Sequence, residues 1–162
     1  MRRAARRLAF TLLLGAAAAV RAAAPAPGSE EAAVYAAAGL SAADGGWRRA
    51  GCATLFKPST ERLDVDGDGK PEIALFLGPS PCFAETAGGN VALFVRDADG
   101  RWIERLGWPP GVELVPTGQS TGGHADLGVA NPGGCLAVFR WNGSGYAHAL
   151  NRAIEPGGCP FR

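Results

Sequence analysis

Short apolar runs separated by turn-forming residues fill the chain from residue 47 onward. Each run is four or five residues long and is bounded by Gly, Pro, Asn or Asp. Runs of this length between such residues are typical of β-strands in an antiparallel sheet. The pattern predicts strands at residues 73–77, 91–95, 112–115, 127–130 and 136–139.

A helical pattern precedes the strands. Ser29 can cap a helix, and Glu30 and Glu31 would lie in its first turn, where carboxylates favour the positive helix end. Residues 32–38 are rich in alanine, the strongest helix former, and Gly39 can end the helix. The apolar residues that could dock this helix on a sheet are Val34, Tyr35 and Leu40.

The predicted strands form a weak internal repeat. Residues 69–74 resemble residues 123–128, and residues 91–94 resemble residues 136–139. In each half a hairpin turn rich in Asp, Asn and Gly comes next, and an aromatic residue follows it. The two turns are residues 97–100 and 142–145, and the aromatic residues are Trp102 and Tyr146. A unit of loop, strand, loop and hairpin therefore occurs twice.

These elements predict an α+β fold that is mainly antiparallel β, with an N-terminal helix followed by two β-repeat units. The expected organisation has three parts. A signal peptide occupies residues 1–24, a linker and the helix occupy residues 25–46, and a disulfide-linked β domain occupies residues 47–162.

The signal peptide is predicted from the first 24 residues. Four arginines among the first seven residues precede an almost wholly apolar stretch at residues 8–20, and Ala22, Ala23 and Ala24 suit a signal peptidase. This stretch is too short for a permanent membrane span, and no later segment approaches about 18 apolar residues. We therefore expect a periplasmic or secreted protein with no membrane span in the mature chain.

Removal of the signal peptide would change the charge of the chain. Five of the 16 basic residues lie in residues 1–24 and none of the 15 acidic residues do, which leaves 11 basic against 15 acidic groups. The mature chain would thus have no basic face to neutralise phosphates. Nucleic acid is therefore excluded as an expected partner.

Four cysteines lie beyond the signal peptide: Cys52, Cys82, Cys135 and Cys159. An even number in an exported chain indicates two disulfides, for which three pairings exist. Cys82 and Cys135 fall in corresponding loops of the two units, while the other two cysteines lie at the two ends of the β region. We expect the pairs Cys82–Cys135 and Cys52–Cys159.

The loop at residues 64–72 has the composition of a calcium site. Asp64, Asp66, Asp68 and Glu72 take positions 1, 3, 5 and 9, with glycines at positions 4 and 6. Calcium binds six to eight oxygen ligands, and glycines allow a loop to curl around the ion. The carbonyl of Lys70 would be the ligand at position 7. The alternative is an acidic turn that is only solvated.

This loop is not an EF-hand, because the bidentate glutamate of that motif would fall at Leu75. It resembles instead the loops of FG-GAP and VCBS repeats, in which a calcium loop joins two β-strands. In the second unit the counterparts of the three aspartates are Gly118, Ser120 and Gly122, and only Asp126 remains acidic. A second metal site is therefore not expected.

A wider resemblance covers most of residues 30–162. The four cysteines, the Asp64 loop, the segments 99–102 and 131–135, and the segment 140–143 resemble a family of small exported bacterial proteins. The resemblance implies the fold and oxidised cysteines, and it carries no activity. FG-GAP proteins are many-bladed propellers, and two units are too few to close one. We expect either a compact partial propeller, whose two units resemble partial blades, or a sandwich-like sheet.

Three functions are weighed, one of which is a purely structural, calcium-stabilised module with no fixed partner. The favoured one is a non-enzymatic binding module, stabilised by calcium, that contacts an envelope protein or a glycan, for example as an inhibitor or immunity-type protein. The alternative is a small envelope hydrolase, because residues 118–122 match G-x-S-x-G around Ser120, with His124 and His148 elsewhere in the chain. That motif needs a strand before it and a helix after it, and only the strand is predicted. The tryptophans, which could form a sugar- or peptide-binding face, are favoured as core residues: Trp47, Trp102, Trp108 and Trp141.

Overall fold

The computed structural model describes residue 26, residues 28–83 and residues 85–159. The predicted signal peptide at residues 1–24 lies outside the described residues. No helix in the described part is long and apolar enough to span a bilayer.

One short helix and three open antiparallel sheets make up the fold, so the predicted mainly antiparallel β class with an N-terminal helix is confirmed. The described sheets do not close into a propeller. The helix is α1 (Glu30–Ala37), and a 3-10 turn, η1 (Glu85–Ala87), lies between β4 and β5. The two-stranded sheet contains β1 (Leu40–Ala43) and β2 (Gly46–Arg49). The middle sheet contains β3 (Ser59–Leu63), β4 (Glu72–Leu77), β5 (Asn90–Arg96) and β6 (Trp102–Glu104). The lower sheet contains β7 (Glu113–Thr121), β8 (His124–Asn131), β9 (Cys135–Trp141) and β10 (Tyr146–Ala153).

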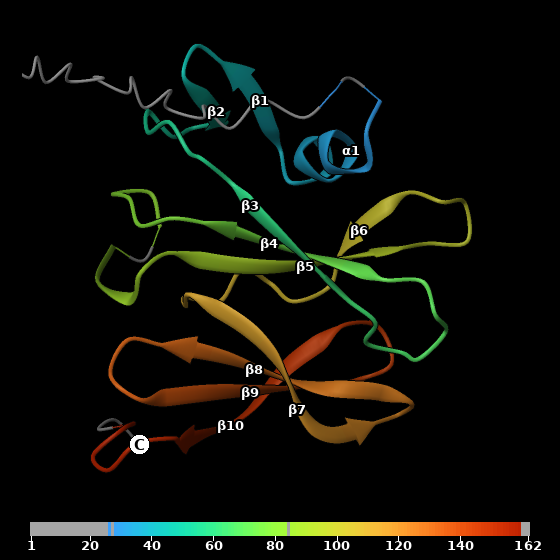
Figure 1. Cartoon of the computed structure of the whole chain (residues 1–162), viewed down its shortest axis with the longest axis vertical. Helices are drawn as coiled ribbons and strands as arrows, with labels where there is room; N and C mark the ends of the chain where they lie inside the picture. The colour runs from blue at the N-terminus through green and yellow to red at the C-terminus, as the bar shows by residue number, and fades with distance from the viewer. Residues whose placement is uncertain (1–25, 27, 84, 160–162) are drawn as a thin grey trace, which may run out of the picture.

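The elements form three layers. In Figure 1, α1 and the β1–β2 hairpin lie above the middle sheet, and the lower sheet lies beneath it. The upper core joins α1 and the hairpin to one face of the middle sheet, through residues such as Val34, Ile73 and Phe94. The lower core lies between the two four-stranded sheets and includes Leu93 and Leu127. The middle sheet is therefore buried on both faces.

The predicted helix and its docking are confirmed. The Ser29 side chain accepts a hydrogen bond from the Ala32 amide, as an N-cap does. Gly39, at φ 72°, follows the end of the helix and donates its amide to the Ala36 carbonyl. The residues of this segment that are buried in the upper core include the three expected ones, Val34, Tyr35 and Leu40.

The five predicted strands are all present, and β6 and β10 follow the two predicted hairpin turns. The sequence did not predict β1, β2, β3 or the 3-10 turn η1. β1, β2 and β3 have no continuous apolar run, because β1 and β2 form a small hairpin at the end of the upper core and β3 is an edge strand whose residues are exposed or half-buried. The boundary expected between residues 46 and 47 falls inside β2.

The repeat seen in the sequence is confirmed by strand register. Each four-stranded sheet runs in chain order, and its two central strands pair residues that the repeat matches. The pairs of the first unit are Ile73–Phe94, Ala74–Leu93 and Phe76–Val91, and the corresponding pairs of the second are Leu127–Phe139, Gly128–Val138 and Ala130–Leu136. Ile73 faces the upper core and its counterpart Leu127 faces the lower core. The two units therefore stack in the same sense, each with the same face turned upward.

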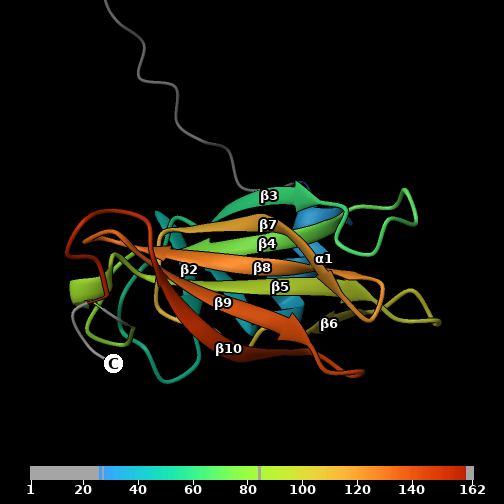
Figure 2. The same ribbon diagram turned by 90° about the horizontal axis from the view of Figure 1, so that it is seen from below.

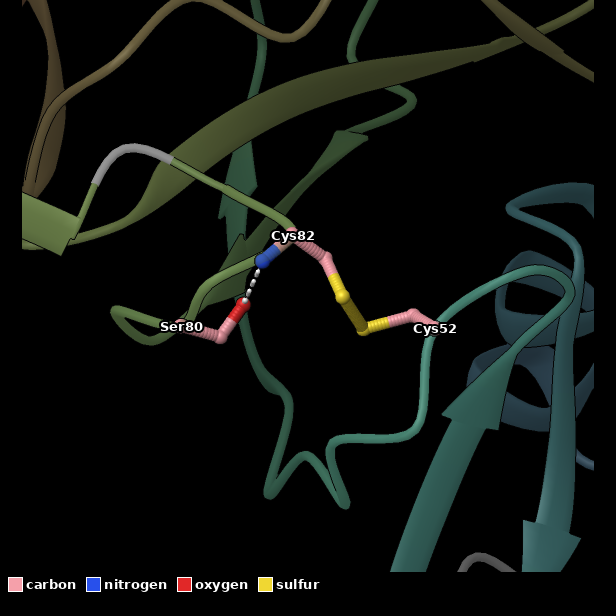
Figure 3. Close-up of a disulfide and its surroundings, with 3 residues drawn as sticks. All are labelled: Cys52, Ser80 and Cys82. Carbon is pink, nitrogen blue, oxygen red and sulfur yellow. Dashed lines mark hydrogen bonds between the residues drawn. A yellow bond between two sulfur atoms is a disulfide. The ribbon is translucent and has the colours of Figure 1, made fainter.

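All four cysteines are oxidised, as expected, but the expected pairing is wrong. The bonds are Cys52–Cys82 and Cys135–Cys159, not Cys82–Cys135 and Cys52–Cys159. Figure 3 shows the first bond beside Ser80, whose hydroxyl accepts a hydrogen bond from the Cys82 amide. Corresponding loops of stacked sheets lie about 10 Å apart, whereas a disulfide requires Cα atoms within about 7 Å. Each cysteine therefore pairs within its own part of the chain. Two such bonds indicate an oxidising environment outside the cytoplasm.

We predict that proteolysis without reduction will release peptides that join Cys52 to Cys82 and Cys135 to Cys159. The double variant Cys52→Ala/Cys82→Ala should lower the free energy of unfolding by about 2–4 kcal/mol, because the bond closes a long loop of the unfolded chain. Mass spectrometry and urea denaturation measure the two effects. A peptide joining Cys82 to Cys135 would contradict this arrangement.

Candidate metal centre

Three of the predicted ligands come together in the loop between β3 and β4. Carboxylate oxygens of Asp64, Asp66 and Glu72 all lie within 4.8 Å of one another. Asp64 and Asp66 are exposed and Glu72, the first residue of β4, is buried. The group therefore lies at the surface, with one buried carboxylate beneath two accessible ones.

The loop is curled by hydrogen bonds from its own backbone to its aspartates. The Asp64 carboxylate accepts from the amides of Gly67 at 2.7 Å and Gly69 at 3.1 Å, and Asp66 accepts from the Asp68 amide at 3.0 Å. Both glycines have positive φ, 76° and 80°, which side chains with a Cβ rarely adopt. These turns direct successive acidic side chains toward one point, as the sequence predicts.

Asp68 and Lys70 are placed differently. Asp68 lies outside the group of three carboxylates; it accepts from the Lys70 amide at 2.7 Å and pairs with the Lys70 ammonium at 3.6 Å. The predicted role of the Lys70 carbonyl as a ligand stays a prediction.

Glu72 is the unusual member of the group. Only 5 % of its surface is exposed, and its carboxylate accepts a hydrogen bond from the Val65 amide at 2.9 Å. Burial raises the pKa of Glu72, and the neighbouring Asp66 and Asp68 raise it further, while the bond from Val65 opposes the shift. Among the described residues, Glu72 forms no ion pair.

The repeat supplies a direct comparison. Asp126 is the counterpart of Glu72 in the second unit and is also buried, at 3 % exposure. It accepts hydrogen bonds from the Thr121 hydroxyl at 2.6 Å and from Nε of Arg140 at 3.1 Å. The counterpart of Arg140 in the first unit is Val95, which carries no charge. One unit thus neutralises its buried carboxylate with a guanidinium, and the other has no cationic side chain at that place.

A cleft opens beside the group. It has a volume of about 460 Å³ and lies between the Asp64 loop and the turn that joins β5 to β6. Asp66 and Glu72 line it, and so do three further acidic and two basic residues: Glu30, Asp68, Asp97, Lys70 and Arg96. A cation could therefore reach the carboxylates from solvent.

The loop is also attached to the lower sheet, a feature that the sequence did not indicate. The Val65 carbonyl accepts from the Ala125 amide at 2.6 Å, and the Val65 side chain is buried in the lower core. The Tyr146 hydroxyl donates to the Ala125 carbonyl at 3.0 Å. Burial raises the pKa of Tyr146, and Glu72, Asp66 and Asp126 raise it further. The candidate site thus lies where the two sheets meet.

The residues of the hydrolase alternative do not assemble a nucleophile site in the described part of the chain. Ser120 lies inside β7, and the next element is the strand β8, so the strand–turn–helix that the motif needs is not formed. His124 contacts the Gly122 carbonyl and stacks on Trp141 with ring centroids 4.0 Å apart. His148 contacts Asn151 instead of Ser120.

The tryptophans take the structural role that the sequence favoured. Trp102 is buried in the upper core. The other three pack against one of the two cores: Trp47, Trp108 and Trp141.

Comparison with known proteins gives no family for this chain. It matches no protein-family model, no curated protein and no solved structure.

We predict that Glu72→Gln will change how the stability of the metal-free protein depends on pH. The folded-state pKa of Glu72 is raised, so the stability that its protonated form contributes is present below the unfolded-state pKa, about 4.3, and is lost as pH rises through the folded-state pKa. Glutamine keeps an oxygen acceptor for Val65 and cannot ionise. In metal-free buffer, melts between pH 4 and pH 8 should therefore show the variant gaining on the parent protein as pH rises.

The matched control is Glu61→Gln, which changes an exposed carboxyl on β3. It should keep the profile of the parent protein. Parallel profiles for Glu72→Gln and the parent protein would contradict the buried, unneutralised state of Glu72.

Proposed function

We propose that the chain is an exported, non-enzymatic binding module whose two sheets are held together by one calcium ion in the loop at residues 64–72. The observation that carries the proposal is the contrast between the two units. Asp126 is neutralised by Arg140, whereas Glu72, buried beside Asp64 and Asp66, has no cationic side chain on it. Clustered carboxylates repel one another, and a bound cation removes that cost.

The chemistry of the donors favours calcium over zinc or copper. The grouped ligands are carboxylate oxygens, which hard cations prefer, and all four cysteines are occupied in disulfides. Calcium accepts irregular sets of oxygen ligands from a flexible loop, and water can complete its coordination. Magnesium requires nearly ideal octahedral coordination, and this loop does not impose that geometry.

The ion would act on the whole fold through Val65. This residue donates its amide to Glu72 and accepts from Ala125 of the lower sheet. A cation that holds Glu72 ionised would strengthen the bond from the Val65 amide, because hydrogen bonds to charged acceptors are stronger than those to neutral ones. The loop would then be fixed against both sheets.

The resemblance to FG-GAP and VCBS repeats supports the same proposal. The acidic loop joins two neighbouring strands, β3 and β4, and the two four-stranded units stack in the same sense, as blades would. In this proposal the units are partial blades of that kind, in a member of a family of small exported bacterial proteins. Removal of residues 1–24 would release the chain to the periplasm or the outside, where its disulfides form.

The proposed partner is an envelope protein or a glycan, and an inhibitor or immunity role fits the size and the compartment. The calcium site would hold the binding surface rigid, since pre-ordering lowers the entropic cost of association.

We predict that calcium will raise the melting temperature of the mature, oxidised protein. At about one hundred times the dissociation constant, the gain in stability is about 2.7 kcal/mol, which corresponds to roughly 10 °C for a chain of this size. Asp66→Ala should remove the shift. Asp44→Ala, in the exposed turn between β1 and β2, should retain it. Melts in calcium and in chelator, with isothermal titration of calcium, measure the effect.

A parent protein that melts at the same temperature in saturating calcium and in chelator would contradict the calcium site. The loop would then be an acidic turn without a resident ion.

A further inference from the structure

The outer face of the lower sheet is open. Figure 2 views the molecule from below and shows β7, β8, β9 and β10 with no described element across them. The opposite face of the same sheet is buried in the lower core. This outer surface is called the open face below.

The repeat shows how the equivalent face of the first unit is covered. The equivalent residues of the middle sheet are buried by the lower sheet, and Ala74, Val91 and Leu93 belong to the lower core. Their counterparts on the open face are Gly128, Leu136 and Val138. The same surface is packed against a four-stranded sheet in one unit. In the other, no described helix or strand lies across it, and its central side chains, Leu136 and Val138, are still only 4 % and 5 % exposed.

Strand register arranges the open face in two rows that cross the sheet. One row is apolar from edge to edge and contains Val115, Gly128, Val138 and Leu150. The other row has an acid at the β7 edge, apolar residues in the centre and a base at the β10 edge: Glu113, Ala130, Leu136 and Arg152. Glu113 and Arg152 are exposed, and neither forms an ion pair among the described residues.

We propose that the open face binds the open face of a second copy of this chain. A two-fold axis parallel to the strands carries the β7 edge of one copy over the β10 edge of the other and keeps each row at its own height. Glu113 of each copy then meets Arg152 of the other, and the apolar rows face each other. The contact is isologous, so it closes after two copies and leaves neither open face available for further association.

The charges on the open face match this occupant. The two charged ends of the row are opposite in sign, so the face is complementary to itself. The other charged pair on this face, Asp126 with Arg140, is already satisfied within one copy. Packed sheets keep their strands within about 30° of each other, which an axis along the strands allows.

The size of the face sets the strength of the dimer. Four strands with about 4.8 Å between neighbours, each contributing about seven residues at about 3.3 Å, cover roughly 400–500 Å². Stable complexes bury about 800 Å² on each partner. Leu136 and Val138 are already covered by their neighbours, and Leu150, 41 % exposed, supplies much of the exposed apolar surface. The dimer is therefore weak and reversible, with a dissociation constant of the order of micromolar or above.

Charge reversal tests the contact. In sedimentation velocity over a range of concentrations, Glu113→Arg and Arg152→Glu should each weaken association about tenfold, because the two-fold axis doubles the effect of every exposed ion pair. The double variant Glu113→Arg/Arg152→Glu restores opposite charges and should recover the association of the parent protein. Both substitutions are at exposed positions, and thermal melts should show that each of the three variants stays folded.

Matched controls are Asp44→Arg and Arg48→Glu, which make the same charge changes in and beside the β1–β2 turn, on the far side of the molecule. Both should dimerise like the parent protein. The proposal is overturned by a parent protein that stays monomeric up to about 1 mM, a concentration at which even a millimolar dimer is half formed or more. A double variant that fails to recover association, or controls that dissociate as much as the test variants, would also overturn it. Neither Glu113 nor Arg152 belongs to the calcium loop, so the outcome is independent of the metal site.

Discussion

Two-sided burial of the middle sheet determines the arrangement of the rest of the chain. Nearly every residue of β4 and β5 is buried, and their side chains alternate between the upper and the lower core. Such a sheet is stable only when both of its faces are covered. The helix and hairpin cover one face and the lower sheet covers the other. The loop between β3 and β4 is thereby brought against the start of β8, which is where the acidic cluster meets the second sheet.

The two units solve one electrostatic problem in two ways. Both carry a buried carboxylate at or near the start of their second strand, Glu72 in β4 and Asp126 in β8. In the second unit, Arg140 of the next strand neutralises the Asp126 carboxylate. The first unit keeps Val95 at that position, which leaves the carboxylate available to an ion from solution. A guanidinium is a fixed part of the chain, whereas a cation bound at the carboxylates of the first unit, as proposed, would exchange with solution.

Sequence patterns predict well the elements whose buried residues are adjacent in the chain. The strands of the two central hairpins are apolar runs between turn residues, and Ser29 with the alanines after it marks the helix. β3 was not predicted, because a strand at the edge of a sheet can be polar. The disulfide pairing failed because it depends on the sense in which the units stack, which no local pattern encodes. The acidic loop could be predicted because its residues are adjacent in the sequence. Its hydrogen bond to Ala125 and its closeness to Tyr146 could not, because they depend on how the two sheets stack.

The placement of the cross-links has a mechanical consequence. Cys52–Cys82 ties the hairpin region to the middle sheet, and Cys135–Cys159 ties the end of the described chain to the lower sheet, so no disulfide crosses from one four-stranded sheet to the other. Under tension applied to the two ends, the sheets can part while every sulfur–sulfur bond stays intact. Resistance to that opening rests on the lower core and on backbone hydrogen bonds between the two sides, among them those from Ala125 to Val65 and from Tyr146 to Arg105. Each part of the chain is thus cross-linked internally, and the contact between the two four-stranded sheets can separate without breaking a disulfide.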